Sequence, residues 1–154
     1  MATYTSTATG IWSAGATWVG GVKPPSGAGH KIVIAAGHTV TYDEAAGTYG
    51  DDTSSTTSAN NAIVVNGTLK FSRSTSTQLT CRGTLFVATN GTLDAGSTAD
   101  PIPSGVTCTI VLNDSATLAV GKHVMTSQNQ TGVTWRINGK PRTRNTGLTS
   151  AISA

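Results

Sequence analysis

A short motif of a small residue, threonine and leucine recurs along the middle of the chain and constrains its fold more than any other feature. The first three copies end at Leu69, Leu85 and Leu93, at spacings of 16 and 8 residues, and a fourth ends at Leu118. Around them, apolar residues alternate with threonine and charged residues in period two, which is the side-chain period of a β-strand. Since no window repeats apolar residues three and four positions apart, the pattern predicts an all-β fold.

Short strands at intervals near a multiple of eight, joined by small-residue corners, are typical of a β-solenoid or a β-sandwich. We favour the solenoid, because a small residue suits a coil corner and each leucine can stack on the leucine of the next coil. The expected fold is a short right-handed parallel β-helix with a capping N-terminal segment, and a β-sandwich is the alternative. Leu69, Leu85, Leu93 and Leu118 are expected to be stacked or nearly stacked inside it.

The segment Gly10–Asp43 is expected to lead the chain into this β-structure. Trp12 and Trp18 are followed by a Gly-Gly-x-x-Pro-Pro bend and by two β-type runs, Lys31–Ile34 and Thr39–Tyr42. The first coil of a solenoid has one face without a neighbour and must be capped. We therefore expect the two tryptophans to cover the open end of the core; stacking on a sugar by exposed rings is the alternative.

The same segment carries a family resemblance. It resembles the opening of the eight-glycine domains, which are short β-helical modules of extracellular animal proteins and of many phage virion proteins. The resemblance returns more weakly at 138–148, where the family usually reads Gly-Lys-Pro, then Trp-Thr and Leu. His30 and Asn145 depart from the family pattern, which commonly has an acidic residue and a tryptophan at these positions. The resemblance implies a β-helical fold and a place among virion proteins.

Composition divides the chain into three parts. Residues 1–10 alternate threonine with small residues and predict an extended arm or a first edge strand, residues 11–138 form the β-helix domain, and residues 139–154 form a basic tail. Within the domain, residues 44–60 are polar and without periodicity, which predicts a surface loop.

Positive charge gathers near the C-terminal end. Arg136, Lys140, Arg142 and Arg144 lie in a stretch without any Asp or Glu, although charged residues make up only 11% of the chain and its net charge is +3. This stretch predicts either a solvated tail or a docking segment for an acidic protein surface. We assign these four residues to a partner interface and expect no binding of nucleic acid.

The other residues that could carry chemistry point to structural roles. His38 is expected to hydrogen-bond the backbone at its Gly-His-Thr corner. Cys81 and Cys108 share the inward parity of their strands and predict buried, unreactive thiols, with a disulfide between coils as the alternative. Asp51 and Asp52 are adjacent but lie in the polar loop, where a calcium site is the alternative to solvated acids. No catalytic residue, metal or cofactor is therefore expected.

These observations predict a non-enzymatic structural protein of a bacteriophage virion. A capsid decoration (cement) protein that stabilises the head is the leading hypothesis, with a tail or fibre component or a carbohydrate- or receptor-binding adhesin module as alternatives. The expected partners are sister copies in a homotrimer, whose arms add to a neighbour's sheet edge, and the major capsid protein or another virion protein. The polar start of the chain and the lack of a long apolar run predict synthesis in the host cytoplasm and no membrane partner.

Overall fold

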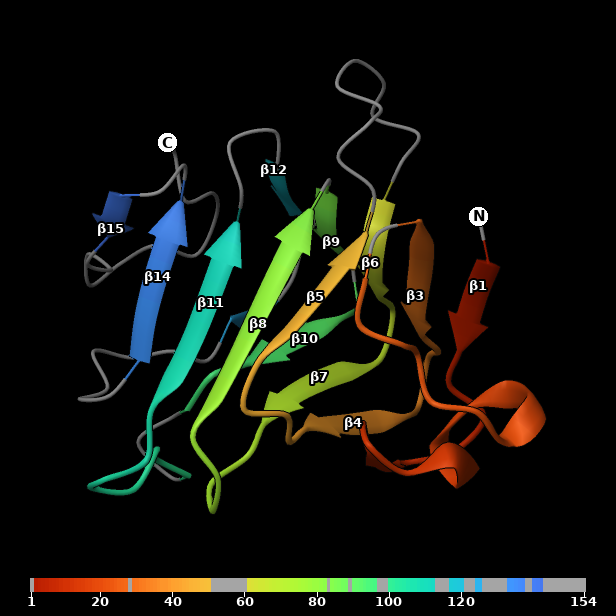
Figure 1. Cartoon of the computed structure of the whole chain (residues 1–154), viewed down its shortest axis with the longest axis horizontal. Helices are drawn as coiled ribbons and strands as arrows, with labels where there is room; N and C mark the ends of the chain where they lie inside the picture. The colour runs from red at the N-terminus through yellow and green to blue at the C-terminus, as the bar shows by residue number, and fades with distance from the viewer. Residues whose placement is uncertain are drawn as a thin grey trace.

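The structure is a computed structural model that describes residues 2–27, 29–50, 61–82, 84–88, 90–96, 100–112, 117–120, 124–125, 133–137 and 140–142. These residues form an all-β solenoid of parallel sheets, as the sequence pattern predicts, rather than a β-sandwich. Figure 1 shows the coils following one another from β1 to β15 across the molecule.

Three five-stranded sheets run along the solenoid. The first contains β1 (Ala2–Thr5), β3 (His30–Ile34), β6 (Asn61–Val65), β9 (Thr84–Val87) and β12 (Thr117–Val120). The second contains β2 (Gly10–Ile11), β4 (Thr39–Tyr42), β7 (Thr68–Phe71), β10 (Thr92–Asp94) and β13 (Val124–Met125). The third contains β5 (Gly47–Gly50), β8 (Thr77–Arg82), β11 (Cys108–Leu112), β14 (Val133–Ile137) and β15 (Lys140–Arg142).

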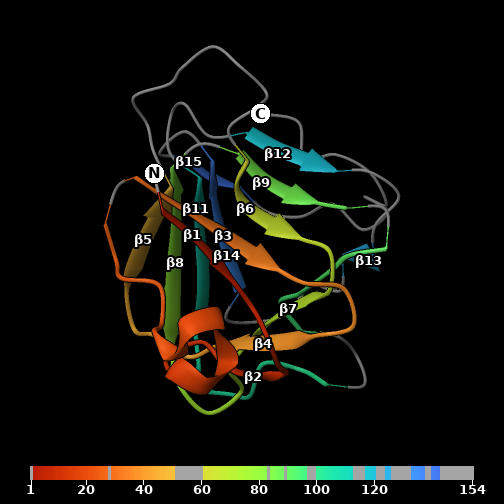
Figure 2. The same cartoon turned by 90° about the vertical axis from the view of Figure 1, so that its right-hand side faces the viewer.

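The chain visits the three sheets in turn, so β3–β5, β6–β8, β9–β11 and β12–β14 are successive coils. Among the strands that the structure describes, every pair is parallel except β14 with β15. Two 3₁₀ turns, η1 (Gly15–Thr17) and η2 (Val19–Gly21), precede the first full coil. Figure 2 looks onto this N-terminal end, where β1, β2 and the two turns lie in front of the coils.

Residues in matching registers stack into ladders that fill the interior. The predicted leucines form two ladders instead of one, because successive copies of the motif fall in different sheets. Leu69 pairs with Leu93 between β7 and β10, whereas Leu85 pairs with Leu118 between β9 and β12. Leu69, Leu85 and Leu93 are fully buried, and the side chain of Leu118 lies outside the described residues. The prediction of stacked leucines is therefore right for neighbouring coils but wrong for a single file.

Small residues at the corners of the motif are required by close approach of the backbone. A Cβ atom added to Gly67 would lie 2.3 Å from the carbonyl oxygens of both Ala35 and His38. At Gly91 it would lie 2.0 Å from the carbonyl oxygen of Val65. Such distances are far inside van der Waals contact, so each corner rests directly on the preceding coil and only glycine fits.

One alternative for the N-terminal segment is confirmed, and one prediction about a chain segment is wrong. Residues 2–5 form the first edge strand, because β1 pairs in parallel with β3 of its own chain. An internal partner is favoured because pairing with it costs no association entropy. The segment 44–60 is not an unbroken loop, since Gly47–Gly50 forms β5 against β8 and buries Tyr49. The buried ring of Tyr49 anchors β5 in the core.

The C-terminal tail predicted at 139–154 also contains structure, because β15 (Lys140–Arg142) pairs antiparallel with β14. Cys81 and Cys108 are buried thiols, as expected. Burial raises the pKa of each thiol to about 12, so neither carries an appreciable amount of thiolate at neutral pH. The strand register places Cys108 opposite Thr77 and Cys81 opposite Leu112, so the two thiols are not neighbours and form no disulfide with each other.

Candidate functional site

An aromatic cluster fills the N-terminal end of the core. The ring of Trp12 lies edge-on to Trp18, Tyr42 and Tyr49, with centroids 5.0, 5.1 and 4.9 Å away. Trp12 and Trp18 are 0% and 1% exposed, so they close the core as the sequence predicts and offer no face to a sugar. The indole N–H of Trp18 donates to the carbonyl of Trp12 at 2.8 Å, which fixes how the two rings meet.

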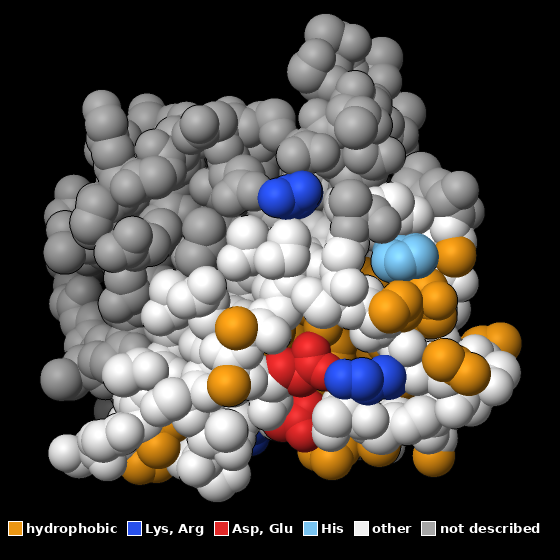
Figure 3. All heavy atoms as spheres, viewed as in Figure 1, with side chains coloured by type: hydrophobic (Ala, Val, Ile, Leu, Met, Phe, Trp, Pro, Cys, Tyr) orange, Lys and Arg blue, Asp and Glu red, His pale blue; other side chains and the backbone are white. Residues whose placement is uncertain are grey.

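A chain of polar contacts leads from this cluster to the surface. The indole N–H of Trp12 donates to the Tyr49 hydroxyl at 3.0 Å, and that hydroxyl donates to the Glu44 carboxylate. The other Glu44 oxygen pairs with Lys23. Burial, followed by the hydrogen bond to Glu44, raises the pKa of Tyr49 above its usual value. Figure 3 shows acidic and basic side chains in contact on this face of the molecule.

The chain itself covers the outer edge of β5, the first strand of the third sheet. Gly27 N–H and Gly29 N–H donate to the carbonyls of Thr48 and Gly50 at 2.8 and 3.2 Å. The Ser26 hydroxyl accepts from the Thr48 N–H at 3.0 Å. Residues 23–27 and Gly29, which we call the strap, therefore occupy the position of a missing coil.

The outer edge of β2, in the second sheet, is closed by the 3₁₀ turn. The carbonyl of Ile11 accepts from the Thr17 hydroxyl at 2.8 Å and from the Ala14 N–H at 3.2 Å. The Ser13 N–H and hydroxyl both donate to the carboxylate of Asp43, at 3.0 and 2.6 Å, and this holds the turn against β4.

The outer edge of β1, in the first sheet, is different. Ser6 N–H donates to the Val33 carbonyl, so the strand directs the backbone groups of residues 4 and 6 toward β3. The groups of Thr3 and Thr5 alternate with these and face away from the sheet. Ser6 forms an antiparallel bridge with Trp18, and the Thr7 N–H donates to the Thr17 carbonyl at 2.8 Å. Residues 17–19 therefore cover the edge from Thr5 to Thr7, and this cover does not extend to the start of β1.

Exposed apolar side chains gather at the same end. Among the described residues, the large hydrophobic side chains left exposed are Ile11, Val19 and Val22, at 47%, 63% and 59%. All three belong to β2, to η2 or to the residue after η2, at the end seen in Figure 2. We call the outer edge of β1 together with these three side chains the end surface.

His38 has a different partner from the one expected. Its Nδ1 lies 3.0 Å from the Ser6 hydroxyl instead of contacting the backbone. The Ser6 oxygen also accepts from the Ala35 N–H at 2.8 Å, so the hydroxyl proton is free to be donated to the imidazole. His38 thus reaches the corner backbone through Ser6, a residue of the arm that sequence reasoning did not consider.

A second ionic cluster fixes the corner after β10. The Arg73 guanidinium lies 2.7 Å from Asp94 and 3.2 Å from Asp100, and Lys70 lies 2.6 Å from Asp100. The hydrogen bond from Lys70 is the main reason why the pKa of Asp100 lies below its usual value. These contacts join β7 to the segment that follows β10 and use the carboxylates for structure.

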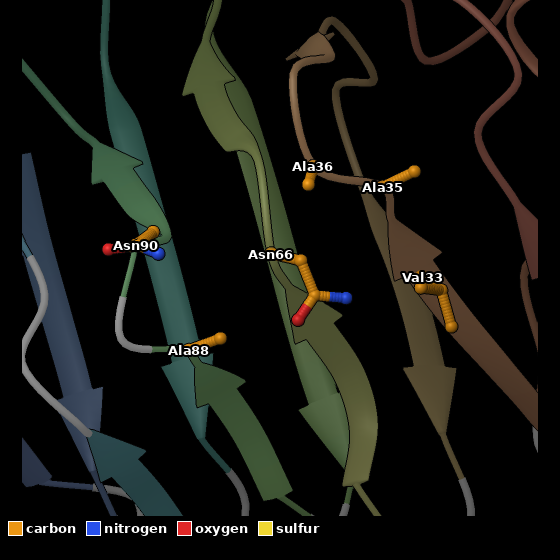
Figure 4. A pocket seen from close by; sticks show the side chains of 6 residues that line it. All are labelled: Val33, Ala35, Ala36, Asn66, Ala88 and Asn90. Carbon is orange, nitrogen blue, oxygen red and sulfur yellow. The ribbon is translucent and has the colours of Figure 1, made fainter.

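A shallow groove of about 460 Å³ runs over another corner, where successive coils turn from the first sheet to the second. Figure 4 shows its lining, in which the amides of Asn66 and Asn90 stand on neighbouring coils beside small apolar side chains. The lining residues are Val33, Ala35, Ala36, Asn66, Ala88 and Asn90. Sequence reasoning missed this groove, although the repeated Asn-Gly-Thr-Leu at 66–69 and 90–93 was its signal.

Several predicted site residues cannot be placed fully. Arg136 lies in β14 and Lys140 and Arg142 lie in β15, but their side chains are outside the described residues, as are Arg144 and the pair Asp51 and Asp52. Within the part of the chain that the structure describes, no three His, Cys, Asp or Glu residues are grouped to hold a metal ion. Over the same residues, no helix has the length and apolar character needed to cross a bilayer.

Comparison with known proteins adds one finding to this geometry. No curated protein and no solved structure shows significant similarity to the chain. The sequence model of one family, described as the G8 domain, matches residues 17–149, which extend from the first 3₁₀ turn beyond β15. Since this match spans most of the sequence, the chain belongs to the G8 domain family.

Proposed function

We propose that this domain is a non-enzymatic structural protein of a bacteriophage particle, which acts by attaching to other protein subunits. A capsid decoration protein that stabilises the head is the form we favour, with a tail or fibre component next. The observation that carries the proposal is the end surface, where the exposed side chains of Ile11, Val19 and Val22 lie at one end of the solenoid. Exposed apolar side chains gathered in one region are characteristic of surfaces that meet another protein.

The use of the described carboxylates supports a structural role. Asp43 holds the 3₁₀ turn through Ser13, and Glu44 connects Tyr49 to Lys23. Asp94 and Asp100 pair with basic side chains at the corner after β10. Each of these acids stabilises a junction of the fold. Assignment to a phage particle rests on the resemblance of residues 10–43 to the eight-glycine domains of virion proteins.

We place attachment to the shell at the opposite end of the solenoid. Arg136, Lys140 and Arg142 lie in β14 and β15, the last strands of the third sheet, and Arg144 follows them. Cations in a stretch without acidic residues would repel one another unless they face acidic groups of a partner. A solenoid that binds the shell with its C-terminal end leaves the end surface available for contact with another subunit.

Binding to empty capsids tests the proposal. The purified protein should cosediment with the heads of the phage that encodes it, and electron microscopy should show added density on their outer surface. Arg142→Glu should weaken attachment, and rising salt should do the same because exposed charges are screened within about 10 Å at 0.1 M salt. Lys31→Glu is the matched control, since it makes the same change in charge on β3. Failure to bind heads, tails or fibres would refute the proposal.

The groove of Figure 4 favours a second candidate, a carbohydrate- or receptor-binding module. Side-chain amides both donate and accept hydrogen bonds, as sugar hydroxyls do, and the alanine methyl groups provide apolar contact. No charged residue lines the groove, so a neutral glycan is the fitting ligand. A glycan array should then give signals that the Asn66→Ala/Asn90→Ala variant loses, and an array without signals removes this candidate.

A further inference from the structure

We propose that the groove of Figure 4 binds an N-acetylated amino sugar, whose acetamido group enters the hollow between neighbouring corners of the solenoid. The inference rests on the second candidate function and deepens it, because it names the class of sugar. An acetamido group is neutral and joins an amide to a methyl group. Side-chain amides and small apolar side chains are also what lines the groove.

The groove arises where one corner of the solenoid is shorter than its neighbours. Four residues, 35–38, connect β3 to β4, and four residues, 88–91, connect β9 to β10. In the coil between them only two residues, 66–67, connect β6 to β7. Because these strands are in register from coil to coil, the middle corner is set back between the two longer ones. Figure 4 accordingly shows Asn66 between the longer corners.

Backbone hydrogen bonds hold the groove in shape and leave its amides available. The Asn66 N–H donates to the Ile34 carbonyl at 2.9 Å. The Gly91 N–H donates to the Ala88 carbonyl at 2.8 Å. The corners are thus fixed before a ligand arrives, which lowers the entropic cost of binding. The side-chain amides of Asn66 and Asn90, in contrast, have no hydrogen-bond partner among the described residues.

An acetamido group satisfies both kinds of lining. A side-chain amide has two donors and an acceptor, so it can donate to the carbonyl of the sugar amide and accept from its N–H. Asn66 is half-buried and Asn90 is exposed, which places one amide deep in the hollow and the other at its rim. The acetamido methyl group then contacts Ala35 and Ala88. A plain hexose offers only hydroxyl groups, so these apolar side chains would lack an apolar partner.

The surfaces on the two sides of the groove suit the rest of the sugar. On the first sheet, three outward side chains that alternate with fully buried residues are in register: Val33, Val64 and Phe86. On the second sheet, an outward row of hydroxyl groups crosses the same three coils: Thr39, Thr68 and Thr92. An apolar track opposite a row of hydroxyl groups matches a pyranose ring, which has apolar C–H faces and a polar edge.

Size and charge favour this ligand over a protein partner. The groove has a volume of about 460 Å³, which is ordinary for a small-molecule site. A stable protein contact buries about 800 Å² on each partner, which is far more than the six small side chains that line the groove provide. Since none of the six is charged, an acidic sugar gains no ion pair within the groove.

Binding of matched sugars to the full chain is the test. The methyl glycosides of N-acetylglucosamine, N-acetylgalactosamine and N-acetylmannosamine are each compared with the parent hexose. At least one acetamido sugar should bind about tenfold more tightly than its parent, because the hexose leaves an amide in the hollow without its full set of partners. Nuclear magnetic resonance should show the largest shifts at the backbone amides of Ala35, Gly67 and Gly91. Equal binding of acetamido sugars and parent hexoses, or shifts confined to other regions, would overturn the inference.

Asn66→Asp tests the contact directly. It keeps the shape of the side chain but removes its donor, so acetamido sugars should bind about tenfold more weakly. Gln78→Ala is the matched control, because it removes an exposed amide from β8 of the third sheet, and it should bind like wild type. Binding unchanged in Asn66→Asp would contradict the inference.

The outcomes separate this inference from the proposed functions. Preference for plain hexoses would overturn it and leave the carbohydrate-binding candidate standing. Binding of no sugar would remove both, while cosedimentation with capsids decides the virion proposal separately. Loss of capsid attachment in Asn66→Asp would assign the groove to a protein partner and overturn the inference as well.

Discussion

The first coil and the inner coils of the solenoid are filled in different ways. Inner coils bury aliphatic side chains in ladders such as Ile63 to Leu85, where each residue rests on its counterpart in the coils on both sides. At the N-terminal end, Trp12, Trp18 and Tyr49 take their place, and each of them also makes a hydrogen bond. A residue in an inner coil is positioned by contact with the equivalent residues of the neighbouring coils, whereas a residue in the end coil must be positioned by specific polar contacts.

This difference indicates that the two regions are stabilised by different interactions. The inner ladders depend on apolar contact, which is nearly non-directional. The end coil adds directional bonds that extend from Trp12 through Tyr49 and Glu44 to Lys23. Substitutions in the two regions should therefore separate the contribution of apolar packing to the free energy of unfolding from that of the polar hydrogen bonds.

Trp12→Ala should have the largest effect. It removes the ring at the centre of the aromatic cluster and leaves a cavity, with an expected loss of about 3–5 kcal/mol in the free energy of unfolding. Urea denaturation followed by far-ultraviolet circular dichroism measures it. Val19→Ala, on the exposed surface of the same end, is the control and should stay close to wild type. An unchanged midpoint for Trp12→Ala would mean that the cluster does not stabilise the end coil.

Leu85→Ala tests an inner ladder. The side chain is fully buried and stacks on Ile63, so its truncation should cost about 2–5 kcal/mol. Phe86→Ala, at the next position and on the opposite face of β9, should cost much less, because its side chain is not fully buried. Equal losses at Leu85 and Phe86 would contradict the inward and outward alternation on which the solenoid depends.

Tyr49→Phe tests polar anchoring without removing the ring. The variant leaves the Trp12 indole N–H and one Glu44 oxygen without their partner, and a buried group left unsatisfied costs about 1–3 kcal/mol. Tyr42→Phe is the matched control. It removes the bond to the Gln78 carbonyl, at 3.0 Å, and the hydroxyl contact with Tyr49, but it leaves the bonds from Trp12 to Tyr49 and from Tyr49 to Glu44 in place and should be milder. If the two variants lose equal stability, the chain from Trp12 to Glu44 has no special role.

Alkaline pH should destabilise the end coil in particular. Burial is the main reason why the pKa values of Tyr42 and Tyr49 are raised, so both remain protonated in the folded protein while an unfolded tyrosine ionises near pH 10. Above that pH the folded state binds more protons, and stability should fall by up to about 1.4 kcal/mol per pH unit for each tyrosine. Tyrosinate absorbance should rise together with unfolding. Full ionisation of all tyrosines in a folded protein would contradict this.

Lys23→Met should have the smallest effect. The Lys23 side chain is 47% exposed, and exposed ion pairs contribute about 0–1 kcal/mol. Its loss should nevertheless loosen the strap, because Lys23 is the residue that links it to Glu44. Hydrogen exchange at Gly27 and Gly29 should then become faster than in a Lys31→Met control. Unchanged exchange at these glycines would show that their bonds to β5 hold the strap without the ion pair.

The sequence predicts the inner coils well because the residues that determine each strand lie close together in the sequence. Period-two alternation and glycine corners determine which side chains enter the core, and β3, β4 and β7 to β9 lie where the pattern places them. The sequence does not show that the leucines form two ladders, because the spacing of the motif does not reveal how many strands form one coil. Only the register between β7 and β10 and between β9 and β12 shows this.

The end coil was harder to predict because its contacts join residues far apart in the sequence. Trp12 and Trp18 were recognisable as capping residues, but Tyr49 lies 37 residues from Trp12 in a polar segment with no strand pattern. The Ser6 contact with His38 and the bridge between Ser6 and Trp18 likewise depend on where the arm lies. Composition alone cannot show whether an extended arm pairs with its own sheet or with another.

The parallel register also makes the length of each coil adjustable. Ile63 and Leu85 are 22 residues apart and Leu85 and Leu118 are 33 apart, yet each pair stacks in the same sheet. Extra residues are taken up at corners, outside the ladders. Such a chain can gain or lose segments at its corners, by evolution or by engineering, without any change in the packing of its core side chains. Diversity can therefore accumulate at the rims of the solenoid while its axis stays constant.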